Sequence, residues 1–538
     1  MPTALIVGSG PAAAGAALAL CQEPDQRVTI IDVGGRLDAN HQAVVDAMAA
    51  TPPAEWSPHS WTPEDLNEIS VQPIPNAPGG LPEKRAFGSD FPFRDFGQLM
   101  GVRSVGLVND RVVSGAYGGF STVWGAQTMP FNAGTLAGWP IRWTDLEPHY
   151  RAVLQEIPLT GELDDLASLF PLLVTPRPLP PLAERTRMVM ERYDAHRARV
   201  RALGVFVGRA RLAMKAEDCV ECGLCMTGCP YGLIYSASQT VDRLRHSGRI
   251  RYESGLLAYR VGQRDGQAVV NAREVATMQD HEFAADRVFL ACGAIGTTRL
   301  VLGSLQRYDR SVSLGESVQF VVPALSRRPT ADPRHARTFT LNQFNIVVDT
   351  VGDGVQLSQI HFYPYNRTFL DSLPTPLHLT RAQKVTTALL RRLSVGLGYL
   401  PSWHSPRVLV TAKPGRDGVL PELQVDQLGS EKAITMLRQV LKSLLLAAPS
   451  LDLWPVVPKV TVSPGAKSYH IGGSFPHSAS RAAGSQLVTD RQGRLPQWDN
   501  IHLVDASVFP TVPATTFTLT ISANAHRIAS EAIGRGHA

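Results

Sequence analysis

The sequence predicts an α/β protein in which a domain with a parallel sheet is combined with an α+β domain whose sheet is mainly antiparallel. Three observations carry this prediction. Residues 3–20, TALIVGSGPAAAGAALAL, have the order strand, glycine turn, helix. Residues 338–351, TFTLNQFNIVVDTV, alternate between apolar and polar side chains, as half-buried strands do. Residues 431–448, EKAITMLRQVLKSLLLAA, repeat apolar side chains at helical spacing, which indicates a helix covering that second sheet.

Composition and charge exclude some classes of function. The chain has 538 residues and a net charge of +5 from 52 basic and 47 acidic side chains. This charge is dilute and no dense Lys/Arg run with interleaved aromatics occurs, so we expect no nucleic-acid partner. The apolar run at the N-terminus is too short and too rich in glycine for an export signal or a membrane span. We therefore expect no transmembrane segment and a cytoplasmic location.

The first glycine turn has the pattern of a dinucleotide-binding site. Gly8, Gly10 and Ala13 fit G-x-G-x-x-A, in which the glycines let the backbone approach a pyrophosphate at the helix N-terminus. Asp32 ends the next apolar stretch, RVTIID, where a carboxylate accepts hydrogen bonds from ribose hydroxyls. Strand, turn, helix, strand and acid occur in the required order. The pattern predicts a bound dinucleotide and leaves open whether it is FAD or NAD.

A second glycine-rich stretch, SGAYGGFSTVWGAQTMPF, covers residues 114–131. Gly118 and Gly119, followed by the small hydroxyl residue Ser121, allow the backbone to run flat against a planar ring and to point amides at it. By itself the stretch is more typical of a plain glycine-rich loop than of a flavin-binding loop.

Four of the six cysteines lie within eleven positions, at Cys219, Cys222, Cys225 and Cys229. With the proline that follows, they reproduce C-x₂-C-x₂-C-x₃-C-P, the run by which bacterial ferredoxins hold iron–sulfur clusters. Only two cysteines remain elsewhere, so one cluster is predicted, with 4Fe–4S preferred. Zinc and disulfides remain as alternatives, although zinc sites generally use two separated pairs of ligands.

These residues together resemble the glucose-methanol-choline (GMC) family of flavoprotein oxidoreductases. The stretch WPIRWTDLEPHYRAV (139–153) is similar to the helix after that family's flavin loop, and RVFLACGAIGTTRLVLGS (287–304) resembles its returning strand and glycine turn. Residues 493–529 resemble the C-terminal segment that closes the flavin site. Residues 310–455 are only weakly alike and would form the variable substrate domain.

The resemblance implies bound FAD and adds three cofactor-binding residues. These are Gly293 in the returning turn, Asp505 near the FAD, and Thr518 in the last segment. Within the flavin loop, GGFSTVW is similar to the version in pyranose oxidases, where a histidine in the place of Val123 carries a covalent link to the flavin. Valine has no nucleophile, so we predict non-covalent FAD.

The chemistry that the resemblance implies is hydride transfer from an alcohol carbon to flavin, while a base takes the hydroxyl proton. His470, in SYHIGGSFPHS, lies at the family's position for the catalytic histidine, and His477 is the alternative. Where the family has an asparagine or a second histidine, this chain has Thr516, which orients an alcohol but is no base near neutrality. Asn524 lies two helical turns deeper, so we do not assign that role to it. A mechanism with one base is predicted.

The sequence thus favours an FAD-dependent dehydrogenase that oxidises a small alcohol: a sugar, a glycoside, a sterol or another secondary alcohol. Electrons would leave through the cluster to an external acceptor protein, a ferredoxin or a cytochrome. Some GMC sugar dehydrogenases carry a 3Fe–4S cluster, which keeps that type open. The alternatives are a ferredoxin-linked flavin reductase, an oxidase that uses oxygen, and a non-redox flavoprotein with a structural cluster.

The expected domain division follows from these motifs. The FAD-binding domain would comprise residues 1–35, 85–130, 205–305 and 460–538, with the iron–sulfur loop at 217–232. The substrate-binding domain would comprise residues 131–204 and 306–459.

Overall fold

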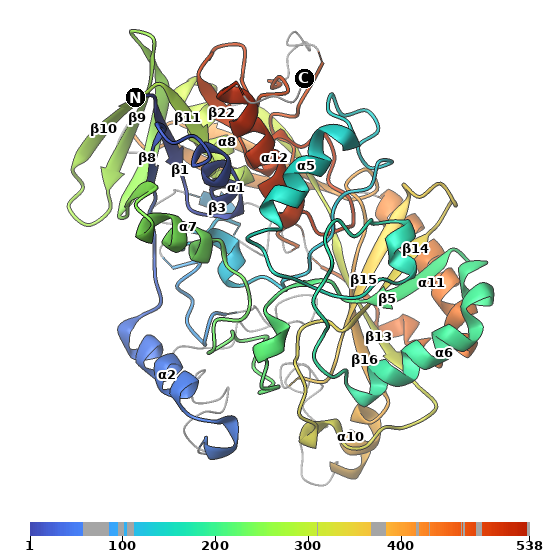
Figure 1. The fold of residues 1–538 in the computed structure, drawn as a ribbon. Coiled ribbons are helices and arrows are strands. Elements are labelled where there is room, and N and C mark those ends of the chain that lie inside the picture. The colour runs from blue at the N-terminus through green and yellow to red at the C-terminus, as the bar shows by residue number, and fades with distance from the viewer. Residues whose placement is uncertain are drawn as a thin grey trace.

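The structure is a computed structural model of the whole chain. It describes residues 1–56, 85–94, 102–104, 112–308, 310–366, 383–415, 419–429, 431–463, 465, 468–479 and 487–534. Figure 1 shows two regions, one built around the N-terminal strands and the last helix and the other around a large antiparallel sheet.

A parallel sheet of five strands carries the N-terminal region. Its order is β22–β11–β1–β2–β7, and every neighbouring pair is parallel. The strands are Ile501–Leu503 (β22), Arg287–Leu290 (β11), Thr3–Val7 (β1), Arg27–Ile31 (β2) and Ile250–Glu253 (β7). Because all five run in one direction, their carboxyl ends meet at one edge of the sheet. The apolar sequence of β1 is buried, as expected for a strand covered on both faces.

Smaller sheets surround this core. A three-stranded antiparallel sheet consists of β10 (Asp280–Ala285), β9 (Gln267–Glu274) and β8 (Leu256–Arg264). A five-stranded sheet has the order β21 (Ile471–Gly472), β12 (Ser311–Glu316), β17 (Arg407–Lys413), β18 (Glu422–Leu428) and β3 (Val102–Ser104). The strands β4 (Leu159–Thr160) and β6 (Leu212–Ala213) form a short pair.

The second region is built on a seven-stranded antiparallel sheet. Its path is β19 (Trp454–Pro455), β13 (Gln319–Leu325), β16 (Leu393–Tyr399), β15 (Leu357–Tyr363), β14 (Phe344–Asp349) and β5 (Val205–Arg209), and β20 (Thr461–Val462) also pairs with β13. Two long helices, α6 (Glu184–Arg201) and α11 (Glu431–Leu451), lie along one face of this sheet, where they complete an apolar core (Figure 1).

The remaining helices complete the fold. They are α1 (Pro11–Leu20), α2 (Ala39–Ala50), α5 (Trp143–Val153), α7 (Ala237–His246), α8 (Ala294–Ser304), α10 (Gln383–Leu390) and α12 (Thr518–Ala532). The last helix, α12, lies against both α1 and α5 (Figure 1). The α1–α12 contact is close because a Cβ added to Gly15 would lie 2.2 Å from the carbonyl oxygen of Ser522.

The fold predicted from the sequence is confirmed in class: a parallel-sheet domain is joined to an α+β region with antiparallel sheets, and the helix expected at 431–448 is α11. Two strands that we assigned to the first domain differ from the expected division. β20 pairs with β13 in the seven-stranded sheet. β5 pairs with β14 in the same sheet. The domain boundaries otherwise stay a prediction.

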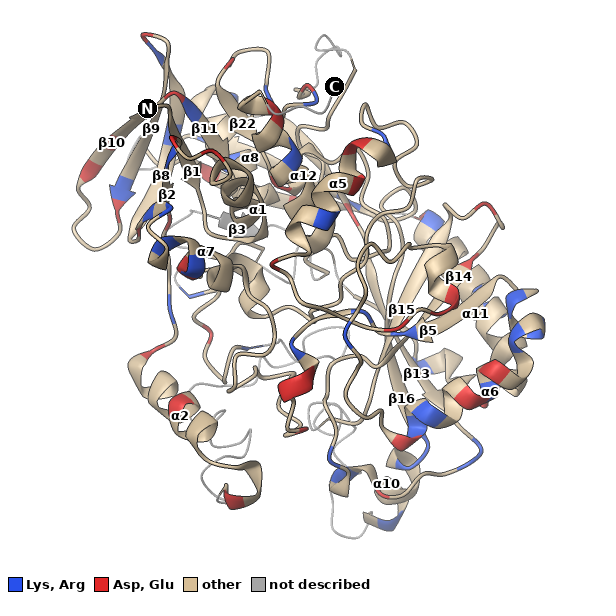
Figure 2. Ribbon diagram, in the orientation of Figure 1, with Lys and Arg blue, Asp and Glu red and all other residues tan. Residues whose placement is uncertain are grey.

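The surface carries both signs of charge. Figure 2 shows basic and acidic residues interspersed along outer elements such as α6 and α7. Within the part of the chain that the structure describes, no helix combines the length and the apolar character needed to cross a membrane.

Candidate active site

Four of the predicted cofactor-binding residues follow four neighbouring parallel strands. Gly8 comes after β1, Asp32 after β2, Gly293 after β11 and Asp505 after β22. The strands are adjacent and parallel, so the fold brings these residues to one edge of the sheet. The carboxyl edge of such a sheet is where open α/β folds bind nucleotides.

The first turn requires glycine. Gly8 has φ +107°, and a Cβ there would lie 2.5 Å from the carbonyl oxygen of Ala291. α1 starts at Pro11 with Gly10 as its N-cap, and no side chain caps its amides in the described structure. The buried Ala13 in its first turn keeps the helix close to the sheet. The exposed amides and the helix dipole make this terminus suited to a phosphate.

The flavin-loop residues lie directly on this turn. Gly118 and Gly119 both have positive φ, and a Cβ on Gly119 would lie 3.3 Å from the Cα of Gly10. The Gly118 amide donates to the Ser9 hydroxyl at 2.9 Å, and that hydroxyl donates to the carboxylate of Asp32. Ser9 therefore connects the turn, the flavin loop and the predicted ribose ligand. Ser9 was not among the predicted site residues, because nothing in the residue type at this variable motif position signals such a role.

Asp32 is held in a polar but desolvated position. Burial raises the pKa of its carboxyl to about 7, although the amides of Val33 and Gly34 donate to it and act in the opposite direction. Hydrogen bonds from ribose hydroxyls would favour the ionised form and bring that pKa down.

Asp505 is fixed by its neighbours. Its Oδ1 accepts a hydrogen bond from the Ser507 amide at 2.9 Å, and its Oδ2 accepts one from the Thr297 hydroxyl at 2.5 Å. The Gly293 amide also donates to it, and burial is the main reason that its pKa is raised. These hydrogen bonds fix the start of α8 relative to the turn that carries Asp505. Thr297 is a further residue of this site that the sequence analysis did not single out.

Ser121 and Val123 lie at the end of the flavin loop. The Ser121 hydroxyl accepts from the Ala237 amide at 2.9 Å and donates to the Gly118 carbonyl at 2.5 Å, so it connects the loop to the start of α7. Val123 follows the 3₁₀ turn Gly119–Thr122 and is partly buried. Thr518 opens α12, the helix that packs on α1.

His470 lies in an aromatic setting. Its ring stacks on Tyr399 with a centroid distance of 4.7 Å and meets the edge of Phe517 at 4.9 Å. Burial lowers the pKa of the imidazole to about 4, and its Nδ1 has no hydrogen-bond partner among the described residues. The residue before it, Tyr469, has φ +57°, a strained conformation for a tyrosine that often marks a functional position.

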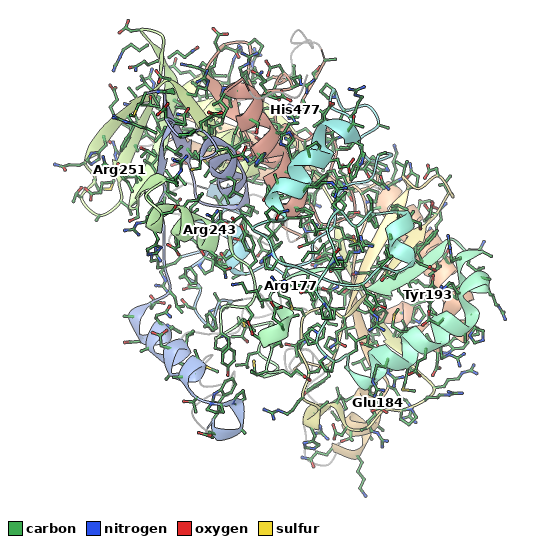
Figure 3. The ribbon with its side chains drawn as sticks, viewed as in Figure 1. Arg177, Glu184, Tyr193, Arg243, Arg251 and His477 are labelled. Atoms are coloured by element: carbon green, nitrogen blue, oxygen red, sulfur yellow. The ribbon has the colours of Figure 1, made fainter. Side chains whose placement is uncertain are left out.

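His477, the alternative base, is occupied by structural contacts. It lies beside α12 (Figure 3), where its Nε2 is 3.3 Å from the side-chain nitrogen of Asn524. Its Nδ1 is 2.7 Å from the carbonyl oxygen of Asp490. Both ring nitrogens therefore have protein partners, which favours His470 as the residue that meets a substrate.

Thr516 is buried beside the segment that follows the flavin loop. Its hydroxyl donates to the carbonyl oxygen of Gln127 at 3.1 Å. Thr516 directly precedes Phe517, the residue whose ring meets His470. The structure therefore brings the predicted base and Thr516 into one region.

The four clustered cysteines lie in one loop. Each sulfur accepts a hydrogen bond from a backbone amide: Cys219 from Glu221, Cys222 from Leu224, Cys225 from Thr340 at 3.3 Å, and Cys229 from the amides of residues 231, 233 and 234. Burial raises the pKa of the thiols of Cys219 and Cys222, to about 11 and about 12. Amide donors around thiolate sulfur are the second-shell contacts that tune iron–sulfur centres.

The iron–sulfur prediction is not confirmed. All six cysteines are free thiols, which makes the disulfide alternative wrong. Among the described residues, no group of three or more His, Cys, Asp or Glu side chains is arranged to hold a metal ion. The iron–sulfur cluster therefore stays a prediction that rests on the spacing of the four cysteines.

The stretch that follows the four cysteines contacts the flavin loop. The indole nitrogen of Trp124 donates to the carbonyl oxygen of Tyr235 at 2.8 Å, and Ser236 lies 3.2 Å from Ser121. The stretch after Cys229 therefore contacts the residues that we expect to face the flavin.

Comparison with known proteins agrees with this geometry. Residues 410–525 match a family model described as GMC oxidoreductase, and this segment contains His470, Asp505 and Thr516. The chain has the GMC oxidoreductase fold. No curated protein sequence matches it.

Two solved structures show the extent of the likeness. A pyridoxine 4-oxidase from Mesorbium loti superposes with a TM-score of 0.59 at 14% identity, over 99% of each chain. A formate oxidase from Aspergillus oryzae, whose structure concerns FAD modification, superposes with a TM-score of 0.60 at 12% identity, over 99% of this chain and 98% of that one. The GMC fold therefore extends over the whole chain, including the weakly similar region 310–455.

Proposed function

We propose that this protein is an FAD-dependent GMC-type oxidoreductase that acts on the CH–OH group of a small alcohol. The observation that carries the proposal is the meeting of Gly8, Asp32, Gly293 and Asp505 at one sheet edge of a GMC fold. FAD bound at this edge would supply the acceptor for the hydride that leaves the alcohol carbon.

His470 would take the hydroxyl proton. Burial lowers the pKa of its imidazole to about 4, so the ring is neutral at pH 7 and able to accept a proton, although it is a weaker base than one whose pKa lies near that pH. The stacked ring of Tyr399 and the edge of Phe517 fix its orientation. These contacts hold the base in place before the alcohol binds, which lowers the cost of reaching a reactive geometry.

The test of this activity is anaerobic reduction of the bound flavin by alcohols. Candidate alcohols should bleach the flavin absorbance without any other reductant, because hydride transfer does not need oxygen. A protein that contains flavin and is bleached only by a reduced ferredoxin would contradict the proposal and favour the reductase.

We also propose that the FAD is non-covalent, since Val123 offers no atom for a link. Acid precipitation should leave the flavin in the supernatant. Flavin that stays with the protein pellet after precipitation would contradict this, and the absorption spectrum of each fraction measures the outcome.

The four cysteines are proposed to hold one iron–sulfur cluster, preferably 4Fe–4S. The amide donors to all four sulfurs support this. Such a cluster supplies one-electron chemistry and would suit transfer to an acceptor protein of the ferredoxin or cytochrome type. Cys222→Ser should reduce bound iron and sulfide and change the paramagnetic resonance signal while FAD content is kept. Cys21→Ser is the matched control, and equal iron in both variants would overturn the assignment.

An oxygen-using oxidase is the second candidate, because the two solved structures named above are described as oxidases. After anaerobic bleaching by an alcohol, admission of air distinguishes the two functions. Return of the flavin colour within one turnover time, with peroxide formed, favours the oxidase, whereas slow return in air and fast return with an artificial one-electron acceptor favours the dehydrogenase.

A further inference from the structure

One face of the seven-stranded sheet is apolar, and the other face mixes polar side chains with apolar ones such as Val347, Val395 and Leu397. In the antiparallel register, Ile360 on β15 and its neighbours Ile346 and Gly398 share the face that packs on α6 and α11. The opposite face presents five polar side chains from four adjacent strands. We call these the polar sheet face: Gln319, Asn345, Gln359, His361 and Tyr399.

The register places these side chains in two rows. Gln319, Tyr399 and Gln359 are directly opposite one another across β13, β16 and β15. Asn345 is opposite His361 across β14 and β15. Side chains that are opposite in this way lie about 4.5–5.5 Å apart at Cβ, so the five form one continuous patch.

Several polar atoms of this patch lack a partner although they are buried. Asn345 and Gln359 have 0% exposure and His361 has 2%. Among the described residues, the side-chain nitrogen of Asn345, the side-chain oxygen of Gln359 and the Nε2 of His361 have no hydrogen-bond partner. Folded proteins rarely leave buried polar groups unpaired, so such a group in this position indicates a ligand or water that pairs with it.

The patch continues into the candidate active site. Tyr399 carries the stacked ring of His470. The side-chain nitrogen of Gln359 donates to the sulfur of Met129 at 3.3 Å, and the hypothetical Cβ of Gly125 lies 3.2 Å from the hydroxyl of Tyr363 on the same face. The polar sheet face therefore meets the segment that leaves the flavin loop.

A second pair of amides borders the same segment. Asn342 donates to the side-chain oxygen of Gln127 at 2.9 Å and also contacts Asn345 at 3.1 Å. The nitrogen of Gln127 and the oxygen of Asn342 have no partner in the described structure. One more donor and one more acceptor thus lie next to the polar sheet face.

From these side chains we propose that the polar sheet face binds the substrate and that the substrate is an uncharged ring compound carrying several hydroxyl groups. The proposal rests on the proposed oxidation of an alcohol. Amides and imidazoles each offer hydrogen-bond donors and acceptors, and hydroxyls both donate and accept, so a compound with several hydroxyls is able to pair with this set of side chains. An apolar alcohol would leave these buried groups unpaired.

The charge of the polar sheet face also limits which substrates it is able to bind. All five side chains of the polar sheet face are neutral, and burial lowers the pKa of His361 to about 3, which keeps its ring uncharged at neutral pH. A substrate with a carboxylate would therefore find no compensating cation among the side chains of this patch.

The experiment compares three kinds of alcohol on the FAD-loaded protein: the neutral polyols glucose, xylose and myo-inositol, the apolar cyclohexanol, and the acid glucuronate. Anaerobic flavin bleaching measures oxidation, and the shift of the unfolding temperature measures binding without chemistry. At least one polyol should bind and should bleach the flavin at least about tenfold faster per unit concentration than cyclohexanol or glucuronate.

The outcomes separate this inference from the proposed function. Bleaching by cyclohexanol at a rate equal to or above that of the polyols keeps the alcohol oxidation and overturns the polyol assignment. A polyol that raises the unfolding temperature without bleaching supports the binding site and counts against the oxidation. Neither binding nor bleaching by any of the polyols overturns the inference.

Variants then test the patch itself. Gln359→Met keeps the length of the side chain and removes the amide, so it should lower kcat/KM for the polyol about tenfold, mainly through KM, with little change for cyclohexanol. Asn345→Leu should act in the same way. Ile360→Val, on the opposite face of the same strand, is the control. It should leave kcat/KM unchanged for the polyol and for cyclohexanol. Equal losses for the two classes of alcohol in Gln359→Met would overturn the role.

Discussion

Replacement of His470 by alanine should lower the rate of flavin reduction by the alcohol by a factor of about 10² to 10⁴, which corresponds to about 2.7–5.4 kcal/mol of activation free energy. His477 has both ring nitrogens engaged by protein groups, and Thr516 is no base near neutrality. In the His470→Ala variant, only water remains to accept the hydroxyl proton of the alcohol. FAD content should stay unchanged, since the His470 ring packs on Tyr399 and Phe517 and His470 is not among the residues predicted to bind the cofactor.

The pH dependence sharpens this prediction. The base has to be neutral, and burial lowers the pKa of His470 to about 4 from the ordinary value. At pH 5 about 90% of such a base is neutral, whereas an ordinary histidine with a pKa of about 6.5 is only about 3% neutral. The wild-type rate per unit substrate concentration should therefore be flat from pH 8 to pH 5 and should fall only below this, towards pH 4.

Stopped-flow absorbance under anaerobic conditions measures both quantities, with the best alcohol from the panel. The matched control is His477→Gln, which should reduce flavin within about threefold of the wild-type rate, because ring nitrogens bonded to Asp490 and Asn524 take no part in proton transfer. A His470→Ala variant that reduces flavin at the wild-type rate would refute the reasoning. So would a variant whose rate still falls between pH 5 and pH 4 as the wild-type rate does.

Two further changes test the cofactor site. Gly15→Ala should lower the free energy of unfolding by about 1–3 kcal/mol, because the new Cβ lies 2.2 Å from the Ser522 carbonyl oxygen. Thermal denaturation measures this, with Gly262→Ala, whose Cβ meets open space, as the control, and equal melting temperatures contradict it. Asp32→Asn should weaken FAD binding about 10- to 100-fold by removing a charged acceptor. Fluorescence titration of the apoprotein with FAD measures it, and unchanged affinity speaks against the ribose contact.

The sequence predicted those parts of the site that depend on short stretches. The turn at Gly8 needs a positive φ that glycine adopts freely, and the apolar strand ahead of Asp32 sets where its carboxylate emerges. Both signals are contained within about thirty residues. The antiparallel second sheet and α11 were predictable for the same reason, because alternation and helical spacing are local patterns.

The features that the sequence did not predict depend on contacts between residues far apart in the chain. β5 pairs with β14, about 140 residues later, and nothing in its own five residues selects that partner over the parallel sheet. The Ser9 hydroxyl bonds to Asp32 and Gly118, and the latter lies 109 residues away. The polar sheet face has the same origin, because Gln359 and Tyr399 become neighbours only when β15 and β16 pair.

The hydrogen bond of Thr516 limits what this residue can do at the position where the family resemblance leads one to expect a second polar catalytic residue. A hydroxyl has one proton, and Thr516 donates it to the carbonyl oxygen of Gln127. It is left with lone pairs only, so it neither removes the alcohol proton nor donates a hydrogen bond to the alcohol oxygen. Its contact instead holds the backbone of Gln127, whose unpaired side-chain nitrogen borders the polar sheet face. We therefore propose that Thr516 is a positioning residue and that His470 alone removes the proton.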